Sequence, residues 1–247
     1  MRIGILGDVH GNMEALEAVT KAMLEEGVDR VLQVGDLVGY GSEPAACIDR
    51  IRELGCLVCR GNHDDAVIGC MDPMYFNHYA RIAIEWTYDK ITSDHIDFLR
   101  SLPYLVEEDI FSMAHGTLYK PDQFGYILSM TEAEQSLMEQ RTLISFVGHS
   151  HKPNFYYMVP NPEDDGEEIT FISPGSRHTE RCKRVLVNVG SVGQPRDEDP
   201  RAAYAIYDAD KRWVAIRRVP YDWEKTRRKI IAAGLPQVLG DRLRLGV

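Results

Sequence analysis

Short apolar runs alternate with segments of helical periodicity through the first two thirds of the chain. Residues 3–6, 31–34 and 57–59 are mostly apolar and typical of buried strands. The segments between them, 12–26 and 43–54, repeat apolar residues on one helical face. This alternation predicts an α/β fold in which crossover helices connect the strands.

The rest of the chain becomes richer in strands after one long helical segment. Residues 74–102 have helical periodicity, and Pro103 ends that segment. Extended runs are expected at 104–106 and 110–114, and a helix at 131–141. The strand-like runs that follow predict a second, partly antiparallel sheet. They cover residues 143–147, 154–159, 169–173, 185–189, 203–208 and 213–219.

Two further segments complete the pattern. Residues 161–168 are polar and acidic and predict a solvated turn. Residues 221–247 predict one helix followed by a basic end. No linker divides the chain, so we predict a single domain over residues 1–247, with 221–247 as a C-terminal helical extension.

Composition and charge exclude some classes of protein. The net charge of −10 disfavours general binding to nucleic acid or to anionic membranes, which needs clustered Lys and Arg. The apolar run before Asp8 is too short for a signal segment or a membrane span. Five cysteines without a regular framework suit a reducing compartment, so a cytoplasmic location is expected. If Cys56 and Cys59 lie on a strand, their thiols face opposite sides and are structural.

Chemistry-bearing side chains directly follow the predicted strands. Because open α/β sheets place their ligand crevices at the carboxyl ends of strands, these side chains are expected to meet. Extended backbone would put both members of an i, i+2 pair on one face, as in Asp8/His10 and His149/His151. Carboxylate, imidazole and amide groups without thiolate suit Mn, Fe, Zn, Co or Ni. The full set is Asp8, His10, Asp36, Asn62, His63, His115, His149 and His151.

These motifs resemble the calcineurin-like metallophosphoesterase superfamily. The resemblance rests on GDVHG at 7–11, GD at 35–36, GNHD at 61–64, AHG at 114–116 and GHSH at 148–151. The stretch NVGSVGQPRD at 188–197 is similar to the small bacterial and archaeal branch that includes the YfcE-type phosphodiesterases. The resemblance implies a four-layer α/β/β/α sandwich of two mixed β-sheets flanked by helices.

The resemblance also implies a dinuclear centre of two divalent transition metal ions. Manganese is the expected ion, with Fe, Zn, Co or Ni as alternatives. A hydroxide that bridges the metals would attack phosphorus, and His63 would protonate the leaving oxygen. Asp64 either orients His63 or caps a loop. The implied metal ligands are Asp8, His10 and His151 for the first ion, Asn62, His115 and His149 for the second, and Asp36 as the bridge.

Several other residues leave two interpretations open. Arg196 either binds a substrate phosphate or forms a surface ion pair with Asp197 or Glu198. Asn12 either touches substrate or caps the helix that begins there. The remaining aromatic and histidine residues are interpreted by their place in the pattern. Tyr119, Phe124 and Tyr126 either line a pocket for a base or pack internally, while His78, His95 and His178 are expected to be structural or solvated.

The function that these observations predict is a metal-dependent phosphoesterase acting on phosphodiester or diphosphate bonds of small or nucleotide-like substrates. Alternatives on the same site are a phosphomonoesterase and a dinucleoside polyphosphate hydrolase. A noncatalytic, protein-binding scaffold of the same fold is the alternative from a different class. A structural zinc module is disfavoured because the ligands are dispersed along the chain. The expected partner is a small-molecule phosphoester, and the oligomeric state stays open.

Overall fold

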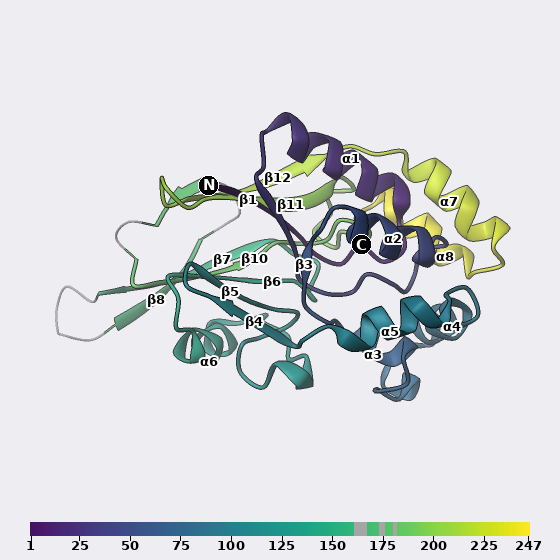
Figure 1. Ribbon diagram of the computed structural model, residues 1–247, viewed down its shortest axis with the longest axis horizontal. Helices are drawn as coiled ribbons and strands as arrows, with labels where there is room; N and C mark the ends of the chain where they lie inside the picture. The colour runs from purple at the N-terminus through teal and green to yellow at the C-terminus, as the bar shows by residue number, and fades with distance from the viewer. Residues whose placement is uncertain (161–166, 173–175, 180–181) are drawn as a thin grey trace.

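Two six-stranded sheets form the centre of the computed structural model, which describes residues 1–160, 167–172, 176–179 and 182–247 (Figure 1). The first sheet has the order β3 (Leu57–Val58), β2 (Arg30–Gln33), β1 (Arg2–Leu6), β11 (Ala202–Asp208), β12 (Trp213–Val219) and β9 (Ser176–His178). The second has the order β4 (Leu105–Glu108), β5 (Phe111–Ala114), β6 (Ile144–Val147), β10 (Arg184–Asn188), β7 (Asn154–Pro160) and β8 (Glu167–Ile172).

Both sheets mix parallel and antiparallel neighbours. In the first sheet β1 is parallel to β2 and antiparallel to β11. In the second sheet β10 is parallel to β6 and antiparallel to β7. The prediction of a second, partly antiparallel sheet is therefore confirmed.

Helices cover the outer face of each sheet. Helices α1 (Met13–Glu25) and α2 (Pro44–Glu53) pack on the first sheet, and α6 (Met130–Glu139) packs on the second. Figure 1 shows these layers in order, with α1 above the first sheet and α6 below the second. The four-layer α/β/β/α sandwich that the sequence predicted is confirmed.

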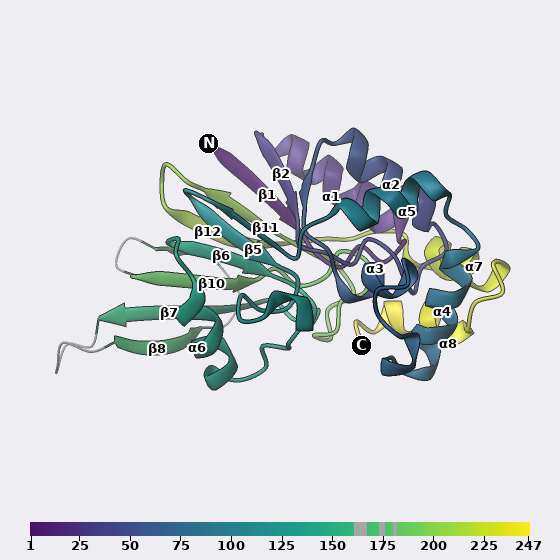
Figure 2. The same cartoon turned by 60° about the horizontal axis from the view of Figure 1, so that its bottom comes forward.

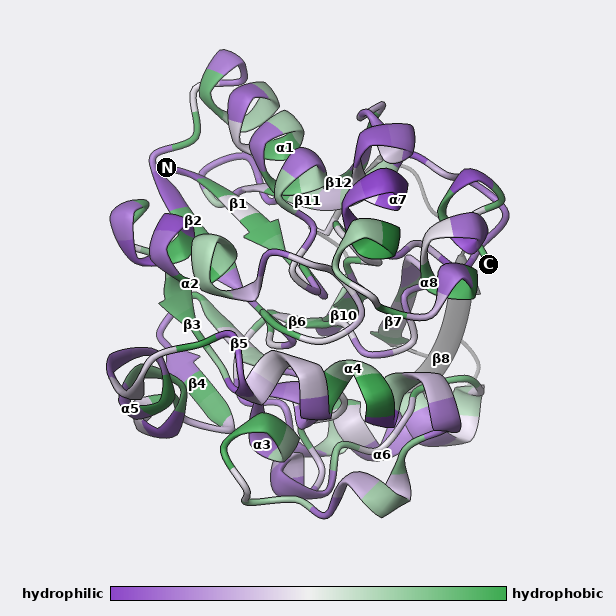
Figure 3. Cartoon of the chain, turned by 90° about the vertical axis from the view of Figure 1, so that its right-hand side faces the viewer, coloured by the Kyte–Doolittle hydropathy of each residue, from purple (hydrophilic) through white to green (hydrophobic). Residues whose placement is uncertain are grey.

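Side chains of one strand alternate between two separate apolar cores. Ile3 and Ile5 of β1 are fully buried between the sheets, whereas Leu6 packs with Leu16 of α1 on the helical side. The cysteines around β3 follow the same rule, because Cys59 lies between the sheets and Cys56 packs against the helical side. In Figure 3 β1 is largely hydrophobic, while α1 alternates between hydrophobic and hydrophilic along its length.

The segment predicted as one long helix over 74–102 is in fact several short elements. They are η1 (Pro73–Tyr75), α4 (His78–Tyr88) and α5 (Ser93–Ser101), and helix α3 (Asn62–Val67) precedes them. Asn77 and Thr92 each accept a hydrogen bond from a backbone N–H in the first turn of the next helix. The prediction of one helix was wrong because these caps restart the helix within a continuous apolar periodicity.

The C-terminal segment also differs from the prediction of one helix and a basic end. It forms α7 (Trp223–Ala232), α8 (Gln237–Asp241) and η3 (Arg242–Arg244). Leu239 and Leu243 are buried against Tyr40 and against Ala80 of α4, so the end of the chain is packed. Figure 2 shows α4, α7 and α8 grouped together, beyond the ends of the strands.

Two smaller predictions concern edge segments. His178 was expected in a polar loop, but it ends β9, whose register pairs it with Trp213 of β12. The acidic turn at 161–168 falls mostly on 161–166, which lie outside the described residues, and β8 begins at Glu167.

A further short 3-10 turn, η2 (Pro121–Gln123), follows β5. In the described parts of the chain, no helix has both the length and the apolar character needed to cross a membrane.

Candidate metal centre

The predicted ligands lie in loops at the carboxyl ends of five strands. Asp8 follows β1, Asp36 follows β2, and Asn62 begins the helix after β3. His115 follows β5 directly, and His149 follows β6. Six of the seven predicted ligands are at most 6% exposed, and Asn62 is half-buried. The structure therefore brings the seven side chains into one buried cluster.

Most residues of this cluster have a backbone in the left-handed conformation. Five of the seven predicted ligands have positive φ angles. A non-glycine residue in a sparsely populated region costs of order 1–3 kcal/mol and persists only where the surrounding structure imposes it. These residues are Asp8 (52°), His10 (49°), Asp36 (59°), His149 (65°) and His151 (59°).

This backbone corrects one step of the sequence-based reasoning. The i, i+2 pairs were expected to share a face because their backbone was assumed to be extended. Instead β1 ends at Leu6 and β6 at Val147, before either pair begins. The paired side chains converge because tight left-handed turns redirect the chain beyond each strand.

The first group of candidate ligands contains Asp8, His10, Asp36 and His151. The Nε2 atom of His10 lies 3.1 Å from Nε2 of His151 and 3.6 Å from Oδ2 of Asp36. The Nε2 atom of His151 lies 3.2 Å from Oδ1 of Asp8. These donor atoms surround one small volume, as the ligands of a single ion would.

The second group contains Asp36, His115 and His149. The Nε2 atom of His115 lies 3.3 Å from Oδ2 of Asp36 and 3.1 Å from Nδ1 of His149. The amide oxygen of Asn62 is also 3.1 Å from His115 Nε2. Asp36 thus belongs to both groups and stands between them.

Backbone carbonyls fix how the histidine rings are turned. Nδ1 of His10 bonds to the Val38 carbonyl at 2.8 Å, and Nδ1 of His115 to the Val34 carbonyl at 2.8 Å. Nδ1 of His151 bonds to the carbonyl of residue 194 at 2.6 Å. A carbonyl can only accept, so each Nδ1 carries a proton and each ring turns its Nε2 atom into the cluster.

This arrangement fits a cation in the cluster. The lone pairs of His10 and His151 face each other across 3.1 Å, which is repulsive unless a proton or a metal ion lies between them. Burial lowers the pKa values of His10, His149 and His151 well below the usual imidazole value, so these rings are neutral near pH 7. Neutral imidazole is the form that ligates metal ions.

His115 is the exception among the four rings. Burial alone would lower its pKa, but the charge and hydrogen bond of Asp36 outweigh burial and raise the pKa to about 9. The same interaction, together with His63, holds the pKa of Asp36 well below its usual value although burial opposes this. A proton on His115 thus balances the buried carboxylate, and a divalent cation bound by both residues would balance it in place of that proton.

Asp64 supports the loop that carries Asp36. Its carboxylate accepts hydrogen bonds from the backbone N–H groups of Asp36 (2.9 Å), Leu37 (3.0 Å) and Gly61 (3.0 Å). Burial and the nearby Asp36 charge raise the pKa of Asp64 to about 7. These contacts are those of a loop-capping carboxylate, and no hydrogen bond among the described residues joins Asp64 to the His63 ring.

His63 lies at the wall of the cavity above the cluster. Its ring centroid is 4.6 Å from that of Tyr40 and 4.9 Å from that of Phe76. Its Nδ1 atom is buried and has no hydrogen-bond partner among the described residues. Burial lowers the pKa of His63 to about 4, so the free protein carries this ring in its neutral form. The backbone N–H of His63 donates to Oδ1 of Asp36 at 2.9 Å.

The two predicted substrate-binding residues are placed differently. Arg196 lines the cavity, where Nη2 donates to the Tyr40 hydroxyl (3.2 Å) and to Oε1 of Gln194 (2.9 Å). Its neighbour Asp197 pairs with Arg218 instead. Asn12 is 1% exposed, and its side-chain oxygen accepts from the N–H of residue 15 at 3.2 Å, as a helix cap does. Of the two, only Arg196 is positioned to meet a ligand in the cavity.

The cavity has a volume of about 370 Å³ and is lined by several residues that sequence reasoning missed. Tyr40 follows β2 and is flanked by Gly39 and Gly41, much as glycines flank the predicted ligands in motifs such as GDVHG at 7–11. Tyr75 and Phe76 belong to the segment that was predicted to be helical and remote from any strand end. Nothing in the local pattern placed these two residues at the site.

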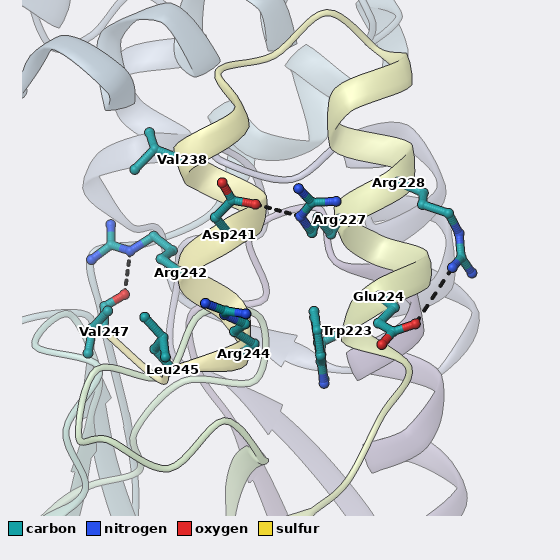
Figure 4. Close-up of a pocket in the computed structure, with 10 residues that line it drawn as sticks. All are labelled: Trp223, Glu224, Arg227, Arg228, Val238, Asp241, Arg242, Arg244, Leu245 and Val247. Carbon is teal, nitrogen blue, oxygen red and sulfur yellow. Dashed lines mark hydrogen bonds and ion pairs between the residues drawn. The ribbon is translucent and has the colours of Figure 1, made fainter.

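A larger cavity of about 730 Å³ lies between α7 and the C-terminal residues, and it contains none of the predicted site residues (Figure 4). Four arginines line it, and two of them form ion pairs. Arg227 pairs with Asp241 at 2.5 Å, and Arg228 pairs with Glu224 at 3.8 Å. The cavity that opens onto the buried cluster of predicted ligands is the one of about 370 Å³.

Comparisons with known proteins agree on one relationship. The model of the calcineurin-like phosphoesterase superfamily domain matches residues 1–212. The uncharacterized protein MJ0912 of Methanocaldococcus jannaschii is 38% identical over 248 residues, covering 99% of this chain and 98% of that protein. The crystal structure of a metallophosphoesterase from Sphaerobacter thermophilus is 35% identical with a TM-score of 0.85, and 100% of both chains is covered. The hypothetical protein PH1004 of Pyrococcus horikoshii OT3 has a TM-score of 0.79 at 21% identity, covering 100% of this chain and 98% of that one.

Proposed function

Because the chain belongs to the calcineurin-like phosphoesterase superfamily, we propose that it is a metal-dependent enzyme that hydrolyses phosphodiester or diphosphate bonds. The substrates that we propose are small or nucleotide-like molecules. Asp8, His10 and His151 would hold one divalent ion, and Asn62, His115 and His149 a second, with Asp36 shared between them.

One observation carries this proposal. The buried donor atoms form two groups that have Asp36 in common, and each group is compact enough to surround one ion. A shared carboxylate favours two neighbouring divalent ions, because it places negative charge between two positive charges. Manganese is the ion that we propose, since oxygen and nitrogen donors without thiolate suit it.

The chain's own residues supply the rest of the chemistry. When bound, two divalent ions would lower the pKa of a coordinated water and neutralise charge on the phosphoryl oxygens. Arg196 is the one Lys or Arg side chain among the described residues that line the cavity, so it would hold a non-bridging phosphoryl oxygen. His63 would donate a proton to the leaving oxygen, and a phosphate anion beside it would raise its pKa from about 4.

The first experiment tests the metal ligands. Protein stripped of metal and resupplied with Mn²⁺ is expected to hydrolyse bis-p-nitrophenyl phosphate. Asp36→Asn and His149→Ala should each lose at least about a hundredfold in kcat/KM, since each removes a ligand of an ion that would stabilise the transition state. His78→Ala is the matched control, because His78 is exposed on α4 and should retain full activity. Full activity in either ligand variant would overturn the assignment.

The second experiment tests His63 separately from the metal. His63→Ala is expected to bind the same amount of Mn²⁺ as the unmodified protein, measured by inductively coupled plasma mass spectrometry. Its turnover should fall by roughly 10²- to 10⁴-fold, the range typical of general acid catalysis. Loss of both ions from this variant would contradict the role of His63 as a proton donor.

A substrate panel distinguishes the alternative activities. We expect diesters to be hydrolysed faster than monoesters and dinucleoside polyphosphates, each measured with several divalent metals. Preference for a monoester or for a dinucleoside polyphosphate would instead support one of the alternatives on the same site. Binding of metal without hydrolysis of any member would support a noncatalytic scaffold.

We also propose a cytoplasmic location. All five cysteines are free thiols, and the two most deeply buried ones, Cys47 and Cys59, lie in the apolar cores. Free thiols without disulfides suit a reducing compartment. Recovery of the native protein in the cytoplasmic fraction of its source cells would agree with this location, and recovery from a secreted fraction would contradict it.

A further inference from the structure

Aromatic side chains form much of the wall of the cavity above the cluster. Tyr75 and Phe76 come from η1 and the residue that follows it, before α4. Phe124 and Tyr126 come from the segment that follows η2, after β5. Tyr40 completes the set from the loop after β2. Segments far apart in sequence thus supply aromatic rings to one small cavity.

Two of these rings contact the histidines of the site. Tyr126 stacks on His149, with ring centroids 3.8 Å apart and an interplanar angle of 21°. Phe76 contacts His63 edge-on, with centroids 4.9 Å apart. A group held by an ion that His149 ligates would therefore begin within a few ångströms of an aromatic ring.

Two tyrosines that line the cavity keep much of their surface exposed to solvent. Tyr75 is 85% exposed and Tyr126 is 47% exposed, although both line the cavity. Large exposed aromatic surface beside a binding site is unfavourable in water and is covered when a flat ligand stacks on it. These rings are consequently suited to a planar ligand group at the mouth of the cavity.

The polar groups of the cavity suit an anion attached to such a ring. Arg196 offers positive charge, and its buried Nε atom has no hydrogen-bond partner among the described residues. Gln123 also lines the cavity and supplies an amide that can both donate and accept. Asp36 is the one acidic lining residue of the described chain, and it belongs to the metal cluster.

We propose that the substrate carries a nucleobase, which stacks on Tyr75 and Tyr126 while its phosphoryl group lies on the metal cluster and Arg196. Gln123 would contact the hydrogen-bonding edge of the base. The cavity of about 370 Å³ is near the lower end of small-molecule sites, so it suits one nucleoside unit. This proposal rests on the proposed phosphoesterase function and narrows its substrate class to nucleotide phosphodiesters.

The test compares two diesters that differ only in the base. The methyl ester of adenosine 5′-monophosphate and the methyl ester of ribose 5-phosphate present the same scissile groups. With Mn²⁺ the unmodified protein should show a kcat/KM roughly tenfold or more higher for the adenosine ester, since stacking on an aromatic side chain has about this effect per base. Equal kcat/KM values for the two esters would overturn the proposal.

Variants locate the selectivity on the proposed rings. Tyr75→Ala and Tyr126→Ala should each reduce the ratio of the two kcat/KM values by roughly fivefold or more, and Tyr75→Phe should retain the ratio because the ring remains. Tyr88→Ala is the matched control, since Tyr88 is 58% exposed on α4 and does not line the cavity. An unchanged ratio in both alanine variants would contradict the proposed stacking, even if overall activity fell.

A binding measurement separates this proposal from the proposed function. Isothermal titration calorimetry compares adenosine 5′-monophosphate with ribose 5-phosphate on the Mn²⁺-loaded protein. Binding of the nucleotide at least tenfold tighter would support base recognition even if neither methyl ester is hydrolysed, and the phosphoesterase function would then be the part that fails. Equal affinities would reject base recognition whatever the activity.

Discussion

Gly39 controls the position of His63, and substituting it tests the proposed acid directly. Gly39 has a φ of +90°, and a Cβ atom built on it would lie 3.0 Å from Cγ of His63 and closer still to Nδ1. Ordinary contact for a Cβ atom begins at 3.4 Å, so in Gly39→Ala the imidazole must move. Tyr40 and Phe76 pack on the same ring and limit the directions in which it can move.

The size of the effect follows from this geometry. A displacement on the order of 1 Å of a catalytic group costs roughly a hundredfold in rate. We therefore expect kcat for bis-p-nitrophenyl phosphate to fall by about a hundredfold in Gly39→Ala, with bound Mn²⁺ unchanged. The alanine at positive φ should also lower the free energy of unfolding by about 1–3 kcal/mol. For a chain of this size each kcal/mol lowers Tm by roughly 2–4 °C.

A second glycine provides the control for backbone strain. Gly55 has a φ of +62°, and a Cβ atom there would meet nothing within 4 Å. Gly55→Ala should therefore show a comparable fall in Tm with full activity. If Gly39→Ala keeps full activity while its Tm falls like that of Gly55→Ala, the reasoning that makes the position of His63 important is refuted.

Three further predictions concern the support of the site, its protons and its thiols. Thr226→Val removes a buried hydrogen bond of 3.0 Å from Thr226 Oγ1 to Oδ1 of Asn12, so the free energy of unfolding should fall by about 1 kcal/mol. An unchanged Tm would show that α7 does not support the segment around Asn12. Because the pKa of His115 is raised to about 9, its ring is protonated at pH 7.5, and Mn²⁺ binding should release a proton and strengthen as pH rises toward 9. Calorimetry in buffers of different ionisation enthalpy measures that proton, and binding enthalpies that do not depend on the buffer would contradict it. Cys70 is exposed, so one thiol of the native protein should react rapidly with Ellman's reagent and Cys70→Ser should remove that fast phase; an unchanged fast phase would contradict the assignment.

The strands and their ends were the most predictable part of the molecule. Apolar runs such as 144–147 are buried between two layers, and a strand that is buried on both faces must consist mainly of apolar residues. Helix boundaries were also close to prediction where one helix spans one periodic segment, as in Met13–Glu25. Prediction was wrong where the same periodicity continues through a break, as between α4 and α5, because a cap such as Thr92 is a single local hydrogen bond that periodicity does not report.

The order of residues along the chain indicates which side chains can meet, because Asp8, Asp36 and His149 each follow a strand and α/β sheets place their ligand crevices at the carboxyl ends of strands. The direction in which these side chains point depends on the folded chain, since left-handed turns and carbonyl contacts such as that of Val38 with His10 need packed neighbours. The segments that cover the site are likewise fixed by the folded chain. Tyr75 reaches the cavity through contacts between residues distant in sequence, and such contacts leave no local period in the chain.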